Sequence, residues 1–368
     1  MPIKVMTVFG TRPETIKMAP LVKELESRSE IESIVCVTAQ HRQMLDQVLE
    51  AFKIKPDYDL DIMQQGQTLS DITSKCLKGL EEIIDKVKPH IVLVHGDTTT
   101  TFAGALAAFY KQVPIGHVEA GLRTYNKYSP FPEEINRQFV GLVSDMNFTP
   151  TEKSKQNLLS EGKNPETIFV TGNTAIDALK ITVREDYQDE IIQWVGTDKM
   201  ILLTAHRREN WGQPMENMFK AIRTIVQRHN DIKVVYPVHL NPLVKATADK
   251  IFKDCDRVKL IPPLDVISFH NLLNKSYIIL TDSGGIQEEA PSLGKPVVVL
   301  RDTTERPEGI EAGTLVLAGT DETNICNIIE ELIVDKFKYE QMSKASNPYG
   351  DGFASKKIVD AILAKFNS

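Results

Sequence analysis

The stretch Ile91-Val-Leu-Val-His-Gly-Asp-Thr-Thr-Thr-Thr101 is a clear example of the pattern that indicates the fold class. Its first part, Ile91–His95, is a short apolar run without strict alternation, which is typical of a parallel strand covered on both faces. A polar turn containing Gly96 and Asp97 follows the run. Parallel strands need crossover connections, and these are usually helices. The stretch therefore predicts one unit of an α/β protein.

Runs of the same kind recur along the chain, with helical patterns between them. Apolar residues repeat at helical spacing from Ile16 to Leu25 and from Leu69 to Val87, the second pattern being entered through Ser70-Asp71. Alternating strands and helices in two sets of six strands predict two Rossmann-like, doubly wound domains. The predicted strands are Ile3–Phe9, Ile34–Ala39, Ile91–His95, Pro114–Glu119, Met146–Pro150, Thr167–Thr171, Met200–His206, Ile232–His239, Val258–Pro262, Tyr277–Thr281, Pro296–Leu300 and Thr314–Leu317.

The length of 368 residues also indicates two domains, at roughly 100–200 residues per domain. Gly172 ends the last strand run of the first half, and a charged helical segment follows it. We therefore predict an N-terminal domain over residues 1–172 and a C-terminal domain over residues 173–352. Helical spacing in Ser355–Phe366 predicts a last helix, within residues 353–368, that packs back on the first domain.

Charge and cysteine content exclude several classes of protein. The 43 Lys and Arg residues stand against 50 Asp and Glu residues, whereas proteins that hold long nucleic acids or anionic membranes usually carry a basic excess. No run approaches the about 18–20 apolar residues of a spanning helix, and the apolar N-terminal stretch is too short for a signal peptide. The four cysteines lie far apart, which argues against a disulfide framework or a zinc ribbon. We predict a soluble, cytoplasmic protein without nucleic-acid or membrane partners.

Polar and ionisable residues follow many of the predicted strands. In open parallel sheets, ligands bind outside the carboxyl ends of the strands. Loops are polar in any protein, but seven such clusters from both halves indicate a ligand held in a cleft between two domains. The clusters are Gly10–Glu14, Gln40–Gln43, His95–Thr98, His117–Arg123, His206–Glu209, His239 and Asp282–Gly285.

Two loops have the residues of a phosphate site. The Walker pattern and the G-x-G-x-x-G fingerprint after a strand are both absent from the sequence, which argues against a simple ATPase and a conventional NAD enzyme. Gly10–Pro13 opens a helix, and Asp282–Gly285 precedes another with two glycines that let backbone amides approach an anion. Glu289, one turn into that second helix, is placed to accept hydrogen bonds from ribose hydroxyls.

A metal site is the alternative for part of this set. His95-x-Asp97 and His117-x-Glu119 each place two ligand-type residues on one face of a strand. Cations gather in the same clusters, however, and they complement an anion better than a metal. We therefore predict no metal and no other cofactor. These cations are Arg12, Lys17, Arg123, Arg207 and Arg208.

The carboxylates Asp97, Glu119 and Glu133 have two interpretations. In a partly dry cleft, burial raises a carboxyl pKa, which suits proton transfer. Equally, Asp97 could cap the helix that follows it, and Arg123 and Arg137 could pair with the acids. The residues by themselves leave both interpretations open.

Nine long motifs, standing in order over nearly the whole chain, give a resemblance to a known family. The chain is similar to the bacterial non-hydrolysing UDP-N-acetylglucosamine 2-epimerases. The motifs are Gly10-Thr-Arg-Pro-Glu-Thr-Ile-Lys17, Thr38-Ala-Gln-His-Arg42, His95-Gly-Asp-Thr-Thr-Thr-Thr101, Gly116-His-Val-Glu-Ala-Gly-Leu-Arg123, Ser129-Pro-Phe-Pro-Glu-Glu134, Thr204-Ala-His-Arg-Arg-Glu209, Tyr236-Pro-Val-His-Leu-Asn-Pro242, Asp282-Ser-Gly-Gly-Ile-Gln-Glu-Glu-Ala-Pro291 and Asn347-Pro-Tyr-Gly-Asp-Gly352.

The resemblance implies a glycosyltransferase-B-like fold, with two Rossmann-like domains around a cleft, in a homodimer. It implies reversible conversion of UDP-GlcNAc to UDP-ManNAc without metal or nicotinamide. Such products supply ManNAc for envelope polymers, among them teichoic acid linkage units, capsules and enterobacterial common antigen.

The resemblance also implies residue roles. Asp97, Glu119 and Glu133 would share the acid–base work. The remaining implied roles are these: His206 and Lys17, with Arg12, at the diphosphate; Ser283, Gly284 and Gly285 at phosphate; Glu289 at the ribose; Arg306 at the nucleotide; and Phe269 beside the uracil. A second UDP-GlcNAc acts as an activator in some relatives, and the matching positions here are Gln40, Gln43, Gln67, Glu133, Arg207 and His239. The chain has Gly66 where such relatives can carry arginine.

Three other functions compete with this one. A hydrolysing epimerase of the same fold would release free ManNAc and UDP. A glycosyltransferase of the same fold would need an acceptor groove, and we find no basic, hydrophobic patch for a lipid acceptor in the sequence. A catalytically dead sugar-nucleotide sensor would have no need of Asp97, Glu119, Glu133 and His206 together.

Overall fold

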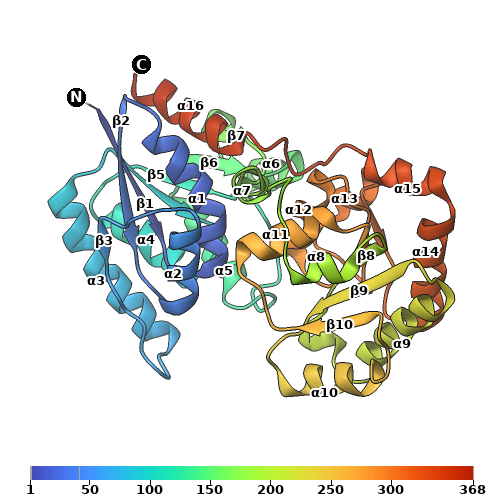
Figure 1. Cartoon of the computed structure of the whole chain (residues 1–368). Coiled ribbons are helices and arrows are strands. Elements are labelled where there is room, and N and C mark those ends of the chain that lie inside the picture. Colours follow the sequence, from blue (N-terminus) through green and yellow to red (C-terminus); the bar gives the residue numbers. More distant parts are fainter. Residues whose placement is uncertain (1, 41, 368) are drawn as a thin grey trace. The chain divides into compact units, whose positions relative to one another are not determined.

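The computed structural model describes residues 2–40 and 42–367, and it divides into two compact units. Unit 1 comprises Met1–Ile181 and Tyr349–Ser368, and unit 2 comprises Thr182–Pro348. Each unit is a parallel sheet with helices connecting its strands (Figure 1). The predicted fold class, α/β with two doubly wound domains, is confirmed. No helix within the described ranges is both long and apolar enough to cross a membrane.

Unit 1 has a sheet in the order β3-β2-β1-β4-β5-β6-β7, so the strand order reverses between β1 and β4. Its strands are β1 (Ile3–Phe9), β2 (Ile31–Val37), β3 (Tyr58–Asp59), β4 (Ile91–His95), β5 (Ile115–Val118), β6 (Met146–Thr149) and β7 (Ile168–Val170). Its helices are α1 (Arg12–Glu26), α2 (Arg42–Ala51), α3 (Leu69–Val87), α4 (Thr99–Tyr110), α5 (Glu133–Val143), α6 (Glu152–Ser160), α7 (Thr174–Thr182), whose last residue belongs to unit 2, and α16 (Ala354–Phe366).

Unit 2 repeats the arrangement with one strand fewer, in the order β10-β9-β8-β11-β12-β13. Its strands are β8 (Lys199–Thr204), β9 (Ile232–Pro237), β10 (Val258–Ile261), β11 (Ile278–Thr281), β12 (Val297–Val299) and β13 (Leu315–Leu317). Its helices are α8 (Glu190–Val195), α9 (Gln213–Arg228), α10 (Pro242–Ile251), α11 (Val266–Lys275), α12 (Gly284–Ser292), α13 (Pro307–Glu311), α14 (Glu322–Val334) and α15 (Lys336–Ser343).

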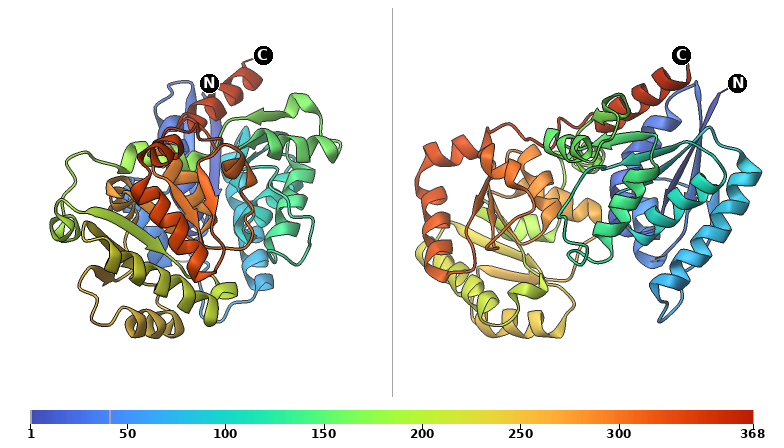
Figure 2. Two further views of the ribbon diagram at one scale, coloured as in Figure 1. Left: turned by 90° about the vertical axis from the view of Figure 1, so that its right-hand side faces the viewer. Right: turned by 180° about the vertical axis from the view of Figure 1, so that it is seen from behind.

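Strands inside each sheet are buried as their composition predicts, whereas the edge strands β7, β10 and β13 keep partly exposed residues. All five residues of β4 and all three of β12 are buried, because helices cover both faces of each sheet (Figure 2). The prediction of twice six strands was wrong by one. The missed strand, β3, is two residues long and polar, pairs with Cys36 and Val37 of β2, and lacks the apolar run by which the others were found.

Helix α3 has the predicted bounds, Leu69–Val87, and of the predicted entry residues Ser70 and Asp71 only Asp71 takes part in capping the helix. The N-cap is Thr68, whose hydroxyl accepts from the Asp71 amide while the Asp71 carboxylate accepts from the Thr68 amide. This is a reciprocal capping box that satisfies two amides which the first turn leaves open. Ser70 lies one residue inside the helix and has no part in the cap.

The chain leaves unit 1 after Ile181, within α7, whereas the sequence placed the boundary after residue 172. Asp177 of α7 gives a physical reason for the later division. Its carboxylate accepts hydrogen bonds from the amides of Ala354 and Ser355, at 3.1 and 2.7 Å, and so caps the start of α16. Helix α16 lies beside α1, where Arg28 pairs with Asp360 (Figure 1). The first turns of α7 are therefore part of unit 1.

Candidate functional site

The carboxyl ends of β4 and β5 bring two acids together in unit 1. His95 and Val118 are register partners at the ends of these neighbouring strands, so Asp97 and Glu119 follow at the same edge of the sheet. Gly96 and Glu119 both have a left-handed backbone, with φ of 67° and 63°. A non-glycine residue in that region is uncommon and marks a sharp turn that the surroundings hold in place.

Asp97 is paired with an arginine and does not cap a helix. Its Oδ2 lies 2.7 Å from Nη2 of Arg137, while Thr98 is the N-cap of α4. Burial raises the pKa of Asp97 to about 6, although Arg137 opposes the rise. The capping interpretation of Asp97 was therefore wrong, and the pairing with Arg137 was right. A carboxyl with a pKa of about 6 can hold or release a proton near neutral pH.

Glu119 accepts hydrogen bonds from two side chains and lies close to a histidine ring that does not hydrogen-bond to it. Nζ of Lys17 is 2.5 Å and Nδ2 of Asn173 is 3.0 Å from its Oε1, and Nε2 of His95 is 3.3 Å from its Oε2. These contacts hold the carboxylate with groups from three separate segments of unit 1. Asn173 was missed from the sequence, because it stands alone in the loop after β7 and matches no motif.

The two histidines beside the acids are neutral. Burial lowers the pKa of His95 to about 4 and that of His117 to about 3. Nε2 of His117 lies 2.7 Å from the carbonyl oxygen of Gly96, so His117 supports the turn that carries Asp97. No group of three or more His, Cys, Asp and Glu side chains in residues 2–40 and 42–367 is arranged to hold a metal ion.

Glu133 and Glu134 start α5 and have different surroundings. Glu133 is half-buried at the first position of the helix, and its charge contributes to the raised pKa of Asp97. Glu134 is completely buried and accepts hydrogen bonds from the amides of Thr124 and Tyr125 and from the Gln138 side chain. Glu134 was missed from the sequence, although its spacing from Arg137 and Gln138 on one helix face was a usable signal.

Arg123 does not pair with the candidate acids. Its Nε and Nη2 lie 2.7 and 2.8 Å from the two carboxylate oxygens of Glu161. This is a bidentate ion pair, in which two parallel hydrogen bonds join the guanidinium and the carboxylate. The suggested pairing of Arg123 with the acids was therefore wrong, because Glu161, at the end of α6, was not visible as a partner from sequence spacing.

The loop at Gly10 does open a helix, but the helix start is occupied by the protein's own carboxylate. Glu14 accepts hydrogen bonds from the amides of Gly10 and Thr11 and from the hydroxyls of Thr98 and Thr101. Arg12, the first residue of α1, is half-buried beside this closed turn. This loop is consequently a less open anion site than its glycine and proline suggested.

The three glutamines of the predicted activator set all lie in unit 1. Gln40 and Gln67 are in two different loops, and Gln43 is in α2. Gln40 follows β2 and accepts from the Thr100 hydroxyl at 3.2 Å, whereas Gln43 is exposed in α2. Gln67 is half-buried and accepts from the Gln64 amide at 3.2 Å. Beside it, Gly66 has a φ of 74° and no atom within 4 Å of the position a Cβ would take.

In unit 2, a buried aspartate organises the loop after β8. Asp282 accepts from the amides of His206 and Arg207, both at 2.8 Å, and its Oδ1 lies 3.4 Å from Nδ1 of His206. The His206 ring stacks on His239 at 5.7 Å between centroids and retains 41% of its side-chain exposure. Burial lowers the pKa of His206, although Asp282 opposes this. Asp282 belongs to a predicted strand-end cluster, but its role in holding the loop after β8 was not predicted.

The start of α12 has the features of an anion site. Ser283 is its N-cap but makes no capping hydrogen bond through its side chain, and Gly284 and Gly285 form the first turn. A Cβ built on Gly284 would lie 3.8 Å from Nη2 of Arg306 and 4.0 Å from Nη2 of Arg207. Two guanidinium groups and the positive end of a helix therefore meet at this point, beside one carboxylate oxygen, Oε2 of Glu305, which also lies 3.8 Å from that Cβ position.

The remaining predicted nucleotide residues flank α12. His270 connects α11 to α12, because its Nε2 lies 3.7 Å from Oε2 of Glu289. Phe269, next to it, is only partly buried against the core. Arg306 pairs with the buried Glu288. Arg306 and Glu289 thus lie beside the two glycines, at 3.8 and 3.7 Å from the positions of their Cβ atoms, whereas Phe269 contacts His270.

Fold and site together define a class: a two-unit α/β protein with an acid pair on one sheet and, on the other, a glycine helix start beside two arginines. The chain belongs to the UDP-N-acetylglucosamine 2-epimerase family, whose family model matches residues 23–363. It is 67% identical over 361 residues to the UDP-N-acetylglucosamine 2-epimerase of Bacillus subtilis, covering 98% of this chain and 95% of that relative.

Two solved structures show the same likeness. The putative UDP-N-acetylglucosamine 2-epimerase of Listeria monocytogenes has a TM-score of 0.96 at 59% identity, covering 100% of this chain and 97% of its own. The UDP-GlcNAc 2-epimerase of Neisseria meningitidis, solved with UDP-GlcNAc bound, has a TM-score of 0.88 at 50% identity, covering 98% and 100%. The predicted membership of the UDP-N-acetylglucosamine 2-epimerase family is confirmed.

Proposed function

We propose that this chain epimerises carbon 2 of UDP-GlcNAc, giving UDP-ManNAc reversibly and without hydrolysis. Family membership and the UDP-GlcNAc-bound structure of the Neisseria relative support the substrate. The observation that carries the chemistry is the pair of acids at the ends of β4 and β5, of which Asp97 has a pKa of about 6. The products would supply ManNAc for envelope polymers such as teichoic acid linkage units or capsules. The enzyme would act in the cytoplasm as a homodimer.

Elimination is the route that suits carbon 2. Its hydrogen has no neighbouring carbonyl, so simple removal would leave an unstabilised carbanion. If the C1–O bond breaks as the proton leaves, the electron pair forms a C1=C2 double bond and UDP departs as the anion. The intermediate is a 2-acetamidoglucal. UDP then adds back to carbon 1 while a proton reaches carbon 2 from the opposite face.

This route needs proton-transfer groups near carbon 2 and fixed cations at the departing diphosphate. Asp97, Glu119 and Glu133 are the acids we assign to the first task. Lys17 and Arg12 in unit 1 and His206 in unit 2 are assigned to the diphosphate. The contact between Lys17 and Glu119 would let substrate phosphate and carboxylate share one cation.

The start of α12 is the proposed site of the nucleotide. Backbone amides of Ser283, Gly284 and Gly285 would hold a phosphate, with Arg306 beside them. Glu289 would accept from the ribose hydroxyls, and Phe269 would lie beside the uracil.

Proton NMR of UDP-GlcNAc incubated with the enzyme in heavy water tests the reaction. We expect UDP-ManNAc to form, with deuterium entering carbon 2 of both epimers. Free ManNAc and UDP as main products would instead place the chain among hydrolysing epimerases. An unchanged spectrum, with UDP-GlcNAc binding shown by calorimetry, would contradict the proposal and favour a glycosyltransferase or a sensor.

A second UDP-GlcNAc would act as an activator through Gln40, Gln43, Gln67, Glu133, Arg207 and His239. The predicted kinetic sign is a sigmoidal rate curve, and stimulation of UDP-ManNAc turnover by added UDP-GlcNAc. A hyperbolic curve without that stimulation would contradict activation, and Gly66 would then be the first position to change.

A further inference from the structure

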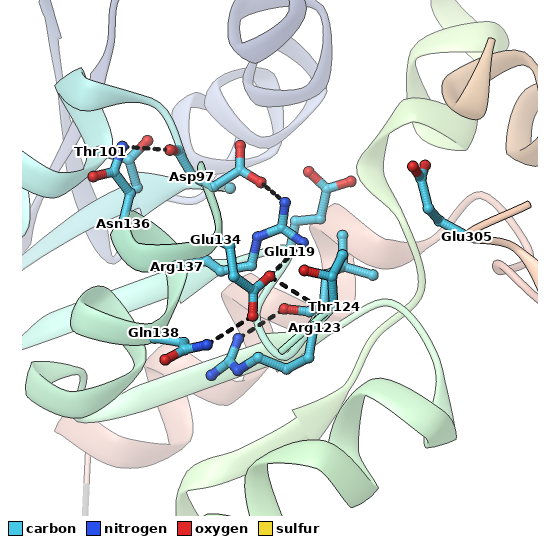
Figure 3. Close-up of polar contacts among 12 residues, drawn as sticks. Asp97, Thr101, Glu119, Arg123, Thr124, Glu134, Asn136, Arg137, Gln138 and Glu305 are labelled. Carbon is cyan, nitrogen blue, oxygen red and sulfur yellow. Dashed lines mark hydrogen bonds and ion pairs between the residues drawn. The ribbon is translucent and has the colours of Figure 1, made fainter. Parts of the chain in front are cut away.

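Arg137 of α5 lies between two carboxylates (Figure 3). Its Nη2 is 2.7 Å from Oδ2 of Asp97, and its Nη1 is 3.6 Å from Oε2 of Glu134. The Arg137 side chain retains 11% of its exposure, so water screens neither contact fully. Because a guanidinium does not lose its proton in proteins, Arg137 is a permanent cation at this position.

Glu134 anchors that cation from behind. The amides of Thr124 and Tyr125 each donate to its carboxylate at 3.0 Å, and Gln138 donates at 2.7 Å. Burial alone would raise the pKa of Glu134, but these hydrogen bonds and Arg137 lower it below the usual value. Glu134 is therefore a fixed anion that joins α5 to the 124–125 loop and holds Arg137 in place.

Helix α5 holds Asp97 at two points. Nδ2 of Asn136 donates to the backbone carbonyl of Asp97 at 2.9 Å, while Arg137 holds the carboxylate. Consecutive residues of one helix thus fix both the backbone and the side chain of the same acid. The direction of the Asp97 carboxylate is set by α5 and not by its own loop alone.

The charges that act on the Asp97 carboxyl come from three segments. Arg137 of α5 and Lys17 of α1 favour its ionised form, whereas Glu119 after β5 and Glu133 of α5 oppose it. Among these charges Arg137 has the largest effect, and only burial exceeds it. Loss of Arg137 would leave a buried carboxyl with two negative neighbours and one more distant cation.

We infer that Arg137 is a positioning residue for the proposed reaction. Arg137 keeps the Asp97 carboxylate ionised and fixes its orientation. Glu134 in turn holds the Arg137 guanidinium in the position that this requires. This role rests on the proposed function, in which Asp97 is an acid–base group. Arg137 acts through Asp97, and the two ion pairs described above are both with carboxylates.

Carboxyl-carbon NMR of protein labelled with ¹³C at the aspartate side-chain carboxyl tests the role without substrate. The Asp97 signal is the one that disappears in Asp97→Asn. In Arg137→Met we expect its titration midpoint to move upward by about 1–3 pH units, the usual effect of losing a paired arginine. Arg28→Met, which removes a paired arginine elsewhere in unit 1, should leave the midpoint where it is.

Turnover measured across pH gives the second readout. In Arg137→Met we expect kcat to fall about tenfold or more, and the limb of the pH–rate profile that reports Asp97 to move upward with the NMR midpoint. Arg137→Lys keeps the charge but loses the two-pronged geometry, so it should show a smaller midpoint shift and a partly restored kcat.

The two proposals fail in different ways. If the wild type shows no deuterium exchange at carbon 2, the proposed function fails while the NMR titration still reports on the ion pair. A folded Arg137→Met whose Asp97 midpoint moves by less than about 0.3 pH units would overturn the positioning role. If Arg137→Met does not fold, equal midpoints in Arg137→Lys and the wild type together with an unchanged pH–rate profile would overturn it.

Discussion

The two units have the same strand order around their first strand but use their helix starts in opposite ways. In unit 1, the start of α1 is closed by Glu14 and that of α4 by Thr98. In unit 2, the start of α12 is formed by glycines, with Arg207 and Arg306 nearby and no capping bond from Ser283. A closed helix start stabilises the fold, whereas an open one can receive an anion. One topology thus supports an acid network in unit 1 and the proposed phosphate site in unit 2.

The largest effect should come from the unit 1 acids. Asp97→Asn keeps the shape of the side chain but removes the exchangeable charge, so we expect turnover to fall by about 10²–10⁴-fold. UDP binding, which we assign mainly to unit 2, should change little in calorimetry.

Asp177→Asn is the matched control, because Asp177 is a buried carboxylate of the same unit that caps α16. It should lower the melting temperature but leave turnover of the folded protein within a few-fold of wild type. Near-normal turnover in Asp97→Asn would contradict the assignment of Asp97, and lost UDP binding would contradict the division of work between the units.

Acid should destabilise the β4–β5 region of unit 1. His95 and His117 are buried with pKa values of about 4 and 3, below the value of 6.5 in the unfolded chain. The unfolded state therefore binds more protons below pH 6.5, and stability falls as the pH falls toward these values. Each histidine should cost about 1–2 kcal/mol between pH 7 and pH 5. Asp97 has a raised pKa, so its protonation stabilises the folded state as the pH falls. This single group offsets only part of the loss caused by the two histidines.

Native-state hydrogen exchange measures this local loss of stability. The exchange rates are converted to opening free energies after correction for the intrinsic exchange rate at each pH. Peptides from β4 and β5 should lose protection at pH 5 more than peptides from β12 and β13. His117→Gln should reduce the difference. Equal losses in all four strands would show that the acid sensitivity is not local to the histidines.

The smallest effect should come from closing the helix start of unit 2. A Cβ on Gly284 would meet its neighbours at 3.8–4.0 Å, which is ordinary contact, so Gly284→Ala should fold with an unchanged melting temperature. The methyl group would lie where an anion approaches the amides, and we expect the Kd for UDP to rise about tenfold. An unchanged Kd would place the phosphate away from the start of α12.

The acid network shows where sequence reasoning stops. Apolar runs such as Ile91–His95 identify strands because a strand covered on both faces must be apolar. The two-residue strand β3 has no such run and was therefore not predicted. Motifs brought Asp97, Glu119 and the glycines of α12 to attention. Partners such as Asn173 for Glu119 were hidden, because they come from segments distant in the sequence.

The α/β class, the strand-end location of the polar residues and the family can all be predicted from sequence patterns. The use of each residue becomes visible only in the folded chain, where Arg123 pairs with Glu161, Arg137 pairs with Asp97, and Glu14 accepts from the amides at the start of its own helix. Periodic patterns can be read from the sequence because each buried face of a strand or helix requires apolar residues at regular spacing. Pairing and pKa depend on distance and desolvation, which exist only once the strands are assembled.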